Sequence, residues 1–369
     1  MKSIVNLLLL LTLAFSLGAC SQLPKADPTA TPPDQELGPT DADVIASLPS
    51  MTFDEKKDLE RITFGSCSDQ KRPQPLWTTI LTFKPQLHLN LGDNIYASKP
   101  DERPLLKVYA KQAKLPEYIA FRSVVPMLST WDDHDYGQND GGADNPVKDE
   151  ALKDFRAFYP VDSAMIPEGR KGVYHSVIIG KLGHKVQILF LDTRYNRSPL
   201  EKNQTPKHAL DIFQATKDKS KTILGDEQWT WLDKELKKPA DLRILISSIQ
   251  FLGEDHGFEK WMNFPHERER MFELFKKRRL KSVLIISGDR HAGEISRMKT
   301  PQGTVITDIT ASGINKTSTI EGEKNRHRIG DKYNPENFGL ADIDWKKKEV
   351  KLQLINLEGK PVSETIHKM

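Results

Sequence analysis

The sequence predicts an α/β fold in which helices alternate with buried β-strands. Short apolar runs rich in β-branched residues recur along the chain, and near-continuous apolar strands are typical of a sheet that is buried on both faces. Stretches with helical periodicity lie between these runs. Each run also ends in polar residues of the kinds that bind ligands. Because ligands gather beyond the carboxyl ends of strands in layered α/β folds, we expect these polar ends to meet in one crevice.

The first twenty residues are expected to be a signal peptide. Lys2 precedes an apolar run, residues 4–17, that is too short to cross a bilayer and suits a signal-peptide core. The run ends in Leu17-Gly18-Ala19-Cys20, which resembles a bacterial lipoprotein box. Cleavage before Cys20 and lipidation of that cysteine would tether an exported chain to a bacterial membrane, in the periplasm or at the cell surface. An uncleaved anchor would lead to nearly the same location.

Residues 21–55 are expected to form a disordered tether, and residues 56–369 the folded domain. The tether is rich in Pro, Thr, Asp and Ala and has no apolar periodicity. The chain carries 54 basic and 51 acidic residues. This balance excludes a generic nucleic-acid or membrane-surface binder, and we interpret the basic run 276–281 as a solvated helix end.

Strands and helices can be placed in order along the domain. Each expected strand is an apolar run bounded by Gly, Pro or polar residues, and each expected helix has an apolar face. The strands are expected within residues 57–67, 86–92, 124–130, 186–191, 242–246 and 282–287, and the helices within residues 76–82, 227–237 and 267–277.

Asp93 stands on the turn that follows the second of these strands, directly after Gly92. A carboxylate buried there without a partner would be costly, and a cation is the simplest partner. Two interpretations are open: Asp93 stabilises its own turn, or it is a metal ligand that bridges ions. The recurrence of ligand-type residues at other strand ends favours the metal ligand.

The other strand ends carry Cys67, Asp133, His134, Asp289 and His291. Carboxylates packed together repel one another unless they are protonated or bound to cations. A mixture of carboxylate, imidazole and thiolate suits iron, zinc or manganese better than magnesium, and its oxygen-rich part suits calcium. Two metal ions in one cleft are a common device for hydrolysing phosphate esters, because they bind phosphoryl oxygens and turn a bound water into hydroxide.

Cys67 has no disulfide partner if Cys20 carries lipid, since the chain has 2 cysteines. Three interpretations are open from the residue alone: an inert buried thiol, a reactive thiol, or a metal-bound thiolate.

Several segments, in a fixed order along the chain, also carry a likeness to a known family: Phe64-Gly65-Ser66-Cys67, Gly92-Asp93-Asn94-Ile95-Tyr96, Trp131-Asp132-Asp133-His134-Asp135, Asp192-Thr193-Arg194, Leu224-Gly225-Asp226-Glu227-Gln228-Trp229 and Ser287-Gly288-Asp289-Arg290-His291. On these segments the chain resembles the PhoD-like alkaline phosphatases and phosphodiesterases, a branch of the calcineurin-like metallophosphoesterase superfamily. The resemblance implies a four-layer αββα sandwich of two mixed β-sheets flanked by helices over residues 56–369.

The resemblance also implies a metal centre. Carried over residue by residue, it makes Cys67 and Tyr96 ligands of Fe3+, with Ca2+ beside it, and makes Asp93 a bridging ligand. Asp133 would stand where the superfamily usually has an asparagine ligand, and Asp289 and His291 would replace its final histidine pair. The free cysteine would then be a ligand.

Two catalytic residues are expected besides the ligands. His134 would lie near the phosphate, as a transition-state stabiliser or as the acid for the leaving group. Arg194 either clamps a phosphate with its planar guanidinium or forms a structural ion pair with Asp192.

Three further features of the sequence lie near the expected ligands. Asp132 and Asp135 are expected to orient their neighbours rather than to bind metal. Residues 247–250, Ser-Ser-Ile-Gln, occupy the place where the superfamily usually has another histidine ligand. Ser312 matches a loop of the family, but no chemistry is assigned to it.

The function expected from the resemblance is hydrolysis of phosphate mono- or diesters by a metal-activated hydroxide, in an enzyme tethered outside the cytoplasm. The contrasting hypothesis is a non-catalytic lipoprotein that binds phosphate or metal. Such a protein would be expected to have lost Asp93, Asp289 or His291, and all three are present. The sequence indicates no oligomeric state.

Overall fold

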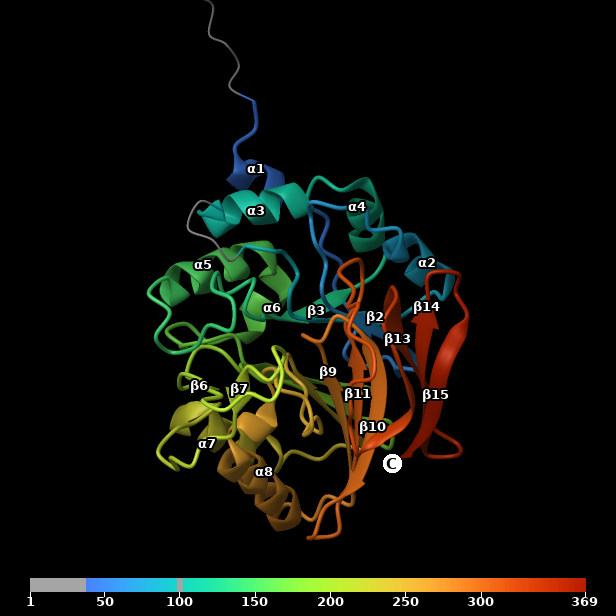
Figure 1. The fold of residues 1–369 in the computed structure, drawn as a ribbon. Helices are drawn as coiled ribbons and strands as arrows, with labels where there is room; N and C mark the ends of the chain where they lie inside the picture. The colour runs from blue at the N-terminus through green and yellow to red at the C-terminus, as the bar shows by residue number, and fades with distance from the viewer. Residues whose placement is uncertain (1–37, 98–101) are drawn as a thin grey trace, which may run out of the picture. The chain divides into compact units, whose positions relative to one another are not determined.

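The helices and strands form four layers, helix, sheet, sheet and helix, in the computed structural model (Figure 1). The structure describes residues 38–97 and 102–369, and Pro39–Met369 forms one compact unit. Both large sheets contain parallel and antiparallel pairs. The predicted α/β fold with two mixed sheets flanked by helices is therefore confirmed.

The first sheet has six strands. They are β1 (Arg61–Gly65), β2 (Leu87–Leu91), β3 (Met127–Thr130), β13 (Asn337–Asp344), β14 (Glu349–Asn356) and β15 (Pro361–Lys368). Their order is β15-β14-β13-β1-β2-β3. β1, β2 and β3 are parallel neighbours, whereas the C-terminal strands join in antiparallel fashion.

The second sheet has seven strands. They are β4 (His175–Ile179), β5 (Val186–Phe190), β8 (Leu242–Ser247), β9 (Ser282–Ser287), β10 (Gly293–Lys299), β11 (Val305–Ala311) and β12 (Arg328–Tyr333). Their order is β12-β10-β11-β9-β8-β5-β4, with β5, β8, β9 and β11 parallel. A small ribbon, β6 (Glu201–Lys202) and β7 (Phe213–Gln214), lies outside both sheets.

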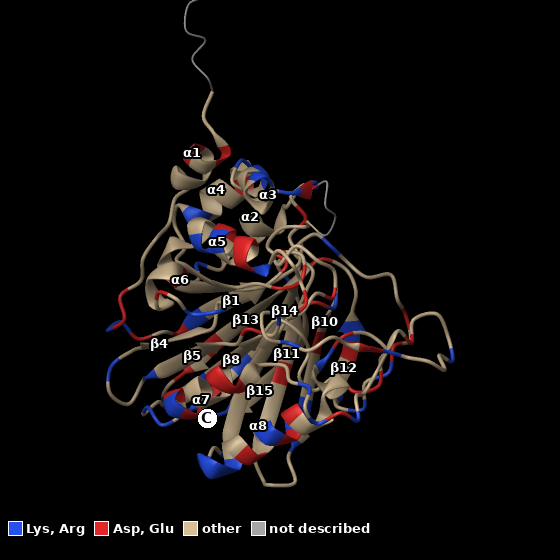
Figure 2. Cartoon of the chain, turned by 90° about the vertical axis from the view of Figure 1, so that its left-hand side faces the viewer, with Lys and Arg blue, Asp and Glu red and all other residues tan. Residues whose placement is uncertain are grey.

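Helices cover the outer face of each sheet. They are α1 (Asp41–Ala46), α2 (Leu76–Thr82), α3 (Leu105–Gln112), α4 (Pro116–Arg122), α5 (Lys148–Phe158), α6 (Pro160–Met165), α7 (Gly225–Glu235), the short 3-10 helix η2 (Trp261–Asn263) and α8 (Pro265–Lys277). α1 to α5 pack in one apolar cluster with the first sheet, and α7 and α8 pack in another with the second. α6 packs Val161 and Met165 against the apolar layer between the sheets. Charged residues are concentrated on helices and loops, while the central strands are mostly uncharged (Figure 2).

The apolar layer between the sheets comes from the two-residue period of the strands. Ile188 on β5 and Ile244 on β8 face the first sheet, where they pack with Leu89 on β2. The alternate residues Leu189 and Leu245 face the helices instead. The side chains between the sheets, those of Leu89, Ile188 and Ile244, are 0% exposed. Truncating one of them to alanine would therefore destabilise the protein by about 2–5 kcal/mol.

Parallel strands with matched register place their carboxyl ends at one edge. Gly65 of β1 pairs with Asn90 of β2, and Leu91 of β2 pairs with Thr130 of β3. A single bridge between Ser66 and Ser312 joins this edge to the segment after β11. The polar residues that follow these strands are thereby gathered, as the sequence predicted.

The folded region begins earlier than the predicted boundary at residue 55. α1 starts with a capping box in which the Thr40 hydroxyl accepts the Asp43 N–H and the Asp43 carboxylate accepts the Thr40 N–H. Ile45 and Leu48 then pack into the helical cluster. The predicted tether is corrected accordingly for residues 41–55. The predicted signal peptide, Cys20 and residues 21–37 lie outside the described residues.

Across residues 38–97 and 102–369, none of the helices combines the length and the apolar character that a bilayer-spanning segment needs.

Candidate metal centre

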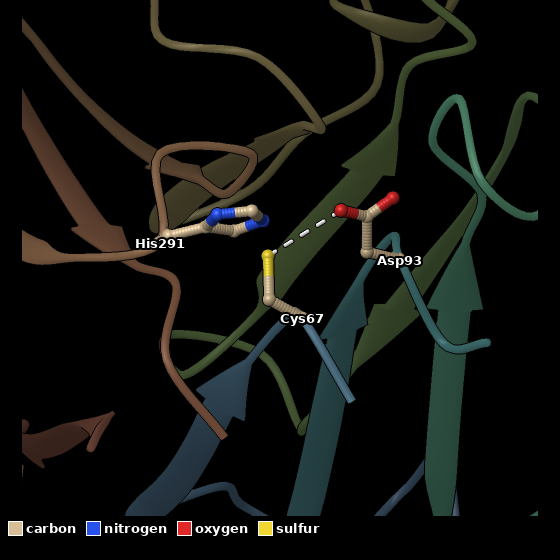
Figure 3. A group of neighbouring side chains, drawn as sticks. All are labelled: Cys67, Asp93 and His291. Carbon is tan, nitrogen blue, oxygen red and sulfur yellow. Dashed lines mark hydrogen bonds between the residues drawn. The ribbon is translucent and has the colours of Figure 1, made fainter. Parts of the chain in front are cut away.

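Ligand-type side chains from both sheets meet at the carboxyl ends of the central strands. Cys67 follows β1, Asp93 follows β2, and His291 lies between β9 and β10. Figure 3 shows these three side chains pointing toward one another, with 3.5 Å between Cys67 Sγ and Asp93 Oδ2. One ligand atom from each of the three lies within 4.8 Å of the other two.

A second group shares Asp93 with the first. It contains Asp93, Asp133 and His134, again with ligand atoms within 4.8 Å of one another. Asp133 and His134 follow β3, the strand beside β2. Asp93 therefore belongs to both groups, and its role as a bridging ligand stays a prediction.

Tyr96 completes this arrangement. Its hydroxyl lies 3.0 Å from Asp93 Oδ2 and 2.9 Å from His291 Nε2. Its ring also packs against His134, with 4.2 Å between ring centroids. The structure thus brings together Cys67, Asp93, Tyr96, Asp133, His134 and His291.

Asp289 belongs to neither of the two groups. Burial raises the pKa of Asp289 well above its ordinary value, and the charges of Asp132 and Asp133 raise it further. Asp289 is therefore electrostatically part of the centre, and its role as a ligand stays a prediction.

The backbone is strained at four of the predicted ligands. Cys67, Asp93, Asp289 and His291 have φ values of +67°, +50°, +69° and +54°. Left-handed conformations of non-glycine residues cost on the order of 1 kcal/mol or more each and cluster at functional sites. Gly92 permits the tight approach, because a Cβ there would lie 2.5 Å from the Cβ of Asp132.

Burial makes the charged forms of Asp93 and Cys67 costly in the centre. Burial raises the pKa of Asp93 well above its ordinary value, and the nearby Cys67 and Asp133 raise it further. Burial also raises the pKa of the Cys67 thiol to about 11. For Asp133 the effect of burial is outweighed by the charges of His134 and Arg194, and its pKa is lowered.

Two buried atoms of the centre have no hydrogen-bond partner among the described residues. They are Oδ1 of Asp133 and Nδ1 of His134. The other oxygen of Asp133 accepts the N–H of Asp140 at 2.7 Å, so one oxygen is held while the other is left open. Buried polar atoms are normally satisfied, and a bound cation would satisfy these. The residues present therefore fit a metal centre.

Arg194 lies beneath the centre and is fully buried. Its Nε donates to Asp132 Oδ1 at 2.7 Å and its Nη1 donates to Glu259 Oε2 at 2.5 Å. The contact between Arg194 and its expected partner Asp192 is limited to the backbone: the N–H of Arg194 donates to the Asp192 carboxylate. The guanidinium forms no ion pair with Asp192, so that interpretation is corrected: the pairs are with Asp132 and Glu259. The prediction that Arg194 clamps a phosphate is corrected as well, because its guanidinium is occupied by these acids and fully buried.

Asp132 and Asp135 hold the loops of the centre in place. Asp135 accepts the backbone N–H groups of Asn94 and Asp132. Asp132 in turn accepts hydrogen bonds from Arg194 and from the hydroxyl of Ser248. These contacts agree with the orienting roles expected for both carboxylates.

Residues 247–250, which the resemblance places where another histidine ligand is usual, contribute to a polar core instead. Ser248 donates to Asp132, and Gln250 donates to Glu294 at 2.6 Å and to Thr310 at 2.9 Å.

Ser312 has a structural role that sequence reasoning missed. Its hydroxyl oxygen lies 3.1 Å from Cys67 Sγ and accepts the backbone N–H of His291 at 2.7 Å. The following residues Asn315 and Lys316 donate their N–H groups to the carbonyl of Cys67. The segment after β11 therefore fixes two predicted ligands that come from different sheets.

Comparison with known proteins identifies the family. A family model described as PhoD-like phosphatase matches residues 63–354. Alkaline phosphatase D of Bacillus subtilis (strain 168) is 24% identical over 294 residues, in a match that covers 69% of this chain and 48% of that protein. The chain thus spans about half the length of this curated relative.

Solved structures share the fold. The structure of PhoD superposes with a TM-score of 0.68 at 19% identity, covering 85% of this chain and 69% of that chain. A purple acid phosphatase from yellow lupin (Lupinus luteus) seeds superposes with a TM-score of 0.56 at 12% identity, covering 85% and 54% of the two chains. Since the family model covers most of its length, the chain belongs to the PhoD-like phosphatase family.

Proposed function

We propose that the protein hydrolyses phosphate esters at the centre formed by Cys67, Asp93, Tyr96, Asp133 and His291. The observation that carries this proposal is the convergence of these side chains at the ends of the central strands of a PhoD-like chain. Metal ions bound there would supply positive charge to the phosphoryl oxygens and lower the pKa of a water molecule.

The residues of the chain have distinct tasks in this proposal. Asp93, Tyr96 and Cys67 hold cations, and the segment around Ser312 keeps the Cys67 and His291 loops in register. A thiol whose pKa is raised to about 11 by burial would deprotonate only with a cation beside it. The mixture of thiolate, phenolate and carboxylate supports Fe3+, with Ca2+ at the oxygen-rich side around Asp133.

His134 acts on the substrate in this proposal. Burial lowers its pKa, and the charges of Arg194 and Lys316 oppose protonation further, although Asp133 favours it. The neutral imidazole then predominates near neutral pH. This favours hydrogen bonding to the phosphate in the transition state over proton donation to the leaving group.

The test is metal analysis of protein purified without chelators, together with hydrolysis of a chromogenic phosphomonoester and its diester counterpart. Bound metal with turnover is the expected result. Bound metal or phosphate without turnover of either ester would instead support the contrasting hypothesis of a non-catalytic binding protein.

We also propose that Cys20 carries a lipid that tethers the protein to a bacterial membrane outside the cytoplasm. The support is the sequence Leu17-Gly18-Ala19-Cys20 after an apolar run. Metabolic labelling with a fatty acid should mark the wild-type protein and leave Cys20→Ala unlabelled. Equal labelling of both would contradict the tether.

A further inference from the structure

Lys316 stands beside the metal centre with a charge that the fold leaves available. Its ammonium lies 5.0 Å from the centroid of the Tyr96 ring, the same ring that packs against His134. Its side chain is 31% exposed, whereas the ligands Cys67 and Asp93 are almost completely buried. Lys316 is thus a cation at the boundary between the ligands and solvent.

The backbone of Lys316 is held firmly. Its N–H donates to the carbonyl of Cys67 at 3.2 Å, and the N–H of Asn315 donates to the same carbonyl at 3.3 Å. The side chain of Asn315 also accepts the N–H of Asp69 at 2.6 Å and donates to the carbonyl of Asp69 at 2.9 Å. The backbone from which the lysine projects is therefore hydrogen-bonded to the carbonyl of a predicted ligand.

The ammonium itself is only weakly engaged. Its carboxylate neighbour is Asp69, at 3.9 Å, which is beyond hydrogen-bond distance. That carboxylate also faces Arg72 at 3.5 Å and accepts the N–H of Lys71. An ammonium has three donors, and those of Lys316 make no hydrogen bond to another residue within 38–97 and 102–369, so they are available to an anion.

We propose that Lys316 binds a non-bridging oxygen of the substrate phosphate and favours dianionic monoesters over monoanionic diesters. This inference rests on the proposed function and adds a specificity determinant to it. A phosphomonoester carries nearly two negative charges at neutral pH, whereas a diester carries one. A fixed cation next to the bound ions therefore stabilises the monoester more strongly, because Coulomb energy scales with the product of the charges.

The test compares Lys316→Met and Lys316→Arg with the wild type, using p-nitrophenyl phosphate and bis(p-nitrophenyl) phosphate. Loss of a charge-assisted hydrogen bond should lower kcat/KM for the monoester by about 10- to 100-fold, mainly through KM, and much less for the diester. Arginine should restore most of the monoester activity because it keeps the charge. Lys153→Met, which removes an exposed charge from α5, is the matched control.

A second readout does not need turnover. Calorimetric titration of metal-loaded protein with inorganic phosphate should show weaker binding to Lys316→Met by a similar factor and normal binding to Lys153→Met. An unchanged ratio of monoester to diester kcat/KM, or unchanged phosphate affinity, would overturn the inference about Lys316. Absence of turnover in metal-loaded wild type would overturn the proposed function instead, and the phosphate titration would still decide whether Lys316 contacts the anion.

Discussion

Two buried polar clusters lie next to each other in this protein, and they balance their charges differently. The cluster of Asp132, Glu259, Arg194 and Arg197 contains two acids and two guanidinium groups, all at most 2% exposed. Its ion pairs join Arg194 to both acids and Arg197 to Glu259 at 2.9 Å. The chain itself supplies every charge that this cluster needs.

The ligand cluster has no such internal balance, although its acids and its thiol are buried too and only its histidines are partly exposed. Asp93 is 1% exposed and lies beside a thiol, a phenol and a second carboxylate. Burial raises the pKa of Tyr96 well above its ordinary value, and the charge of Asp93 raises it further. The comparison teaches that burial alone does not identify a metal centre. What distinguishes Asp93 is that it forms no ion pair within the described part of the chain and lies beside a thiol, a phenol and a second carboxylate, which are all ligand-type groups.

The largest stability effect is expected from breaking the balanced cluster. Arg194→Met would leave Asp132 and Glu259 buried with one guanidinium fewer, and removal of one partner from a buried pair costs about 3–5 kcal/mol. Urea unfolding of metal-free protein measures this loss. Arg61→Met, which removes a 42% exposed partner of Asp342, should cost less than about 1 kcal/mol. Equal losses in the two variants would contradict the distinction.

The opposite result is expected from the ligand cluster. Asp93→Asn removes a buried carboxylate that nothing in the metal-free protein balances, so the stability of the metal-free protein should stay equal or rise. Its turnover with metal should fall by more than about 100-fold, since even residues that only orient ligands contribute about 10- to 100-fold. The exposed Asp331→Asn serves as the control for loss of charge. A folded Asp93→Asn protein with substantial activity would refute the assignment of the centre.

A smaller effect is expected from Ser312, which joins the two ligand loops. Ser312→Ala removes the acceptor of the His291 N–H and the neighbour of the Cys67 sulfur. Metal affinity or activity should fall by about 10- to 100-fold with little change in the thermal midpoint. Ser220→Ala, on an exposed loop, should change neither quantity. Unchanged metal affinity in Ser312→Ala would show that the ligand loops need no such support.

The smallest effect is expected for the pH dependence of stability, and it comes from His88, a buried histidine that forms no ion pair with another described residue. Burial between Trp77 and Phe121 lowers the pKa of His88 to about 3, with Nδ1 hydrogen-bonded to Thr63. The unfolded chain, with a histidine pKa of about 6.5, binds the proton first as pH falls. Stability is therefore complete above pH 6.5 and declines toward pH 3, by on the order of 2 kcal/mol between pH 7 and pH 5.

The measurement for His88 is urea unfolding of metal-free protein at both pH values, for the wild type and for His88→Gln. Glutamine cannot titrate, so its loss of stability should be smaller by the amount assigned to His88. Parallel declines in the two proteins would assign the pH dependence to other groups.

The strands, and the positions of most predicted ligands at the strand ends, could be predicted from the sequence because their signals are local. The apolar runs before Cys67, Asp93 and Asp133 define strands, and the geometry of parallel strands then gathers their ends. The capping box formed by Thr40 and Asp43 is also local, and reading it would have placed the start of the fold near residue 40.

The remaining features depend on contacts between segments far apart in the chain. Arg194 was ambiguous because its partner Glu259 lies 65 residues away, in the stretch between β8 and η2. Ser312 and Lys316 gain their positions only when the segment after β11 crosses to the end of β1. No spacing rule connects these residues in the sequence.

The most direct test of the central claim is metal analysis with visible absorption spectroscopy on the wild type and on Cys67→Ala, both purified without chelators. The account predicts bound iron in the wild type, with a visible band from thiolate and phenolate ligation that is lost or displaced in Cys67→Ala. Folded wild-type protein that binds no metal even when metal is added back, or a spectrum unchanged in Cys67→Ala, would contradict it.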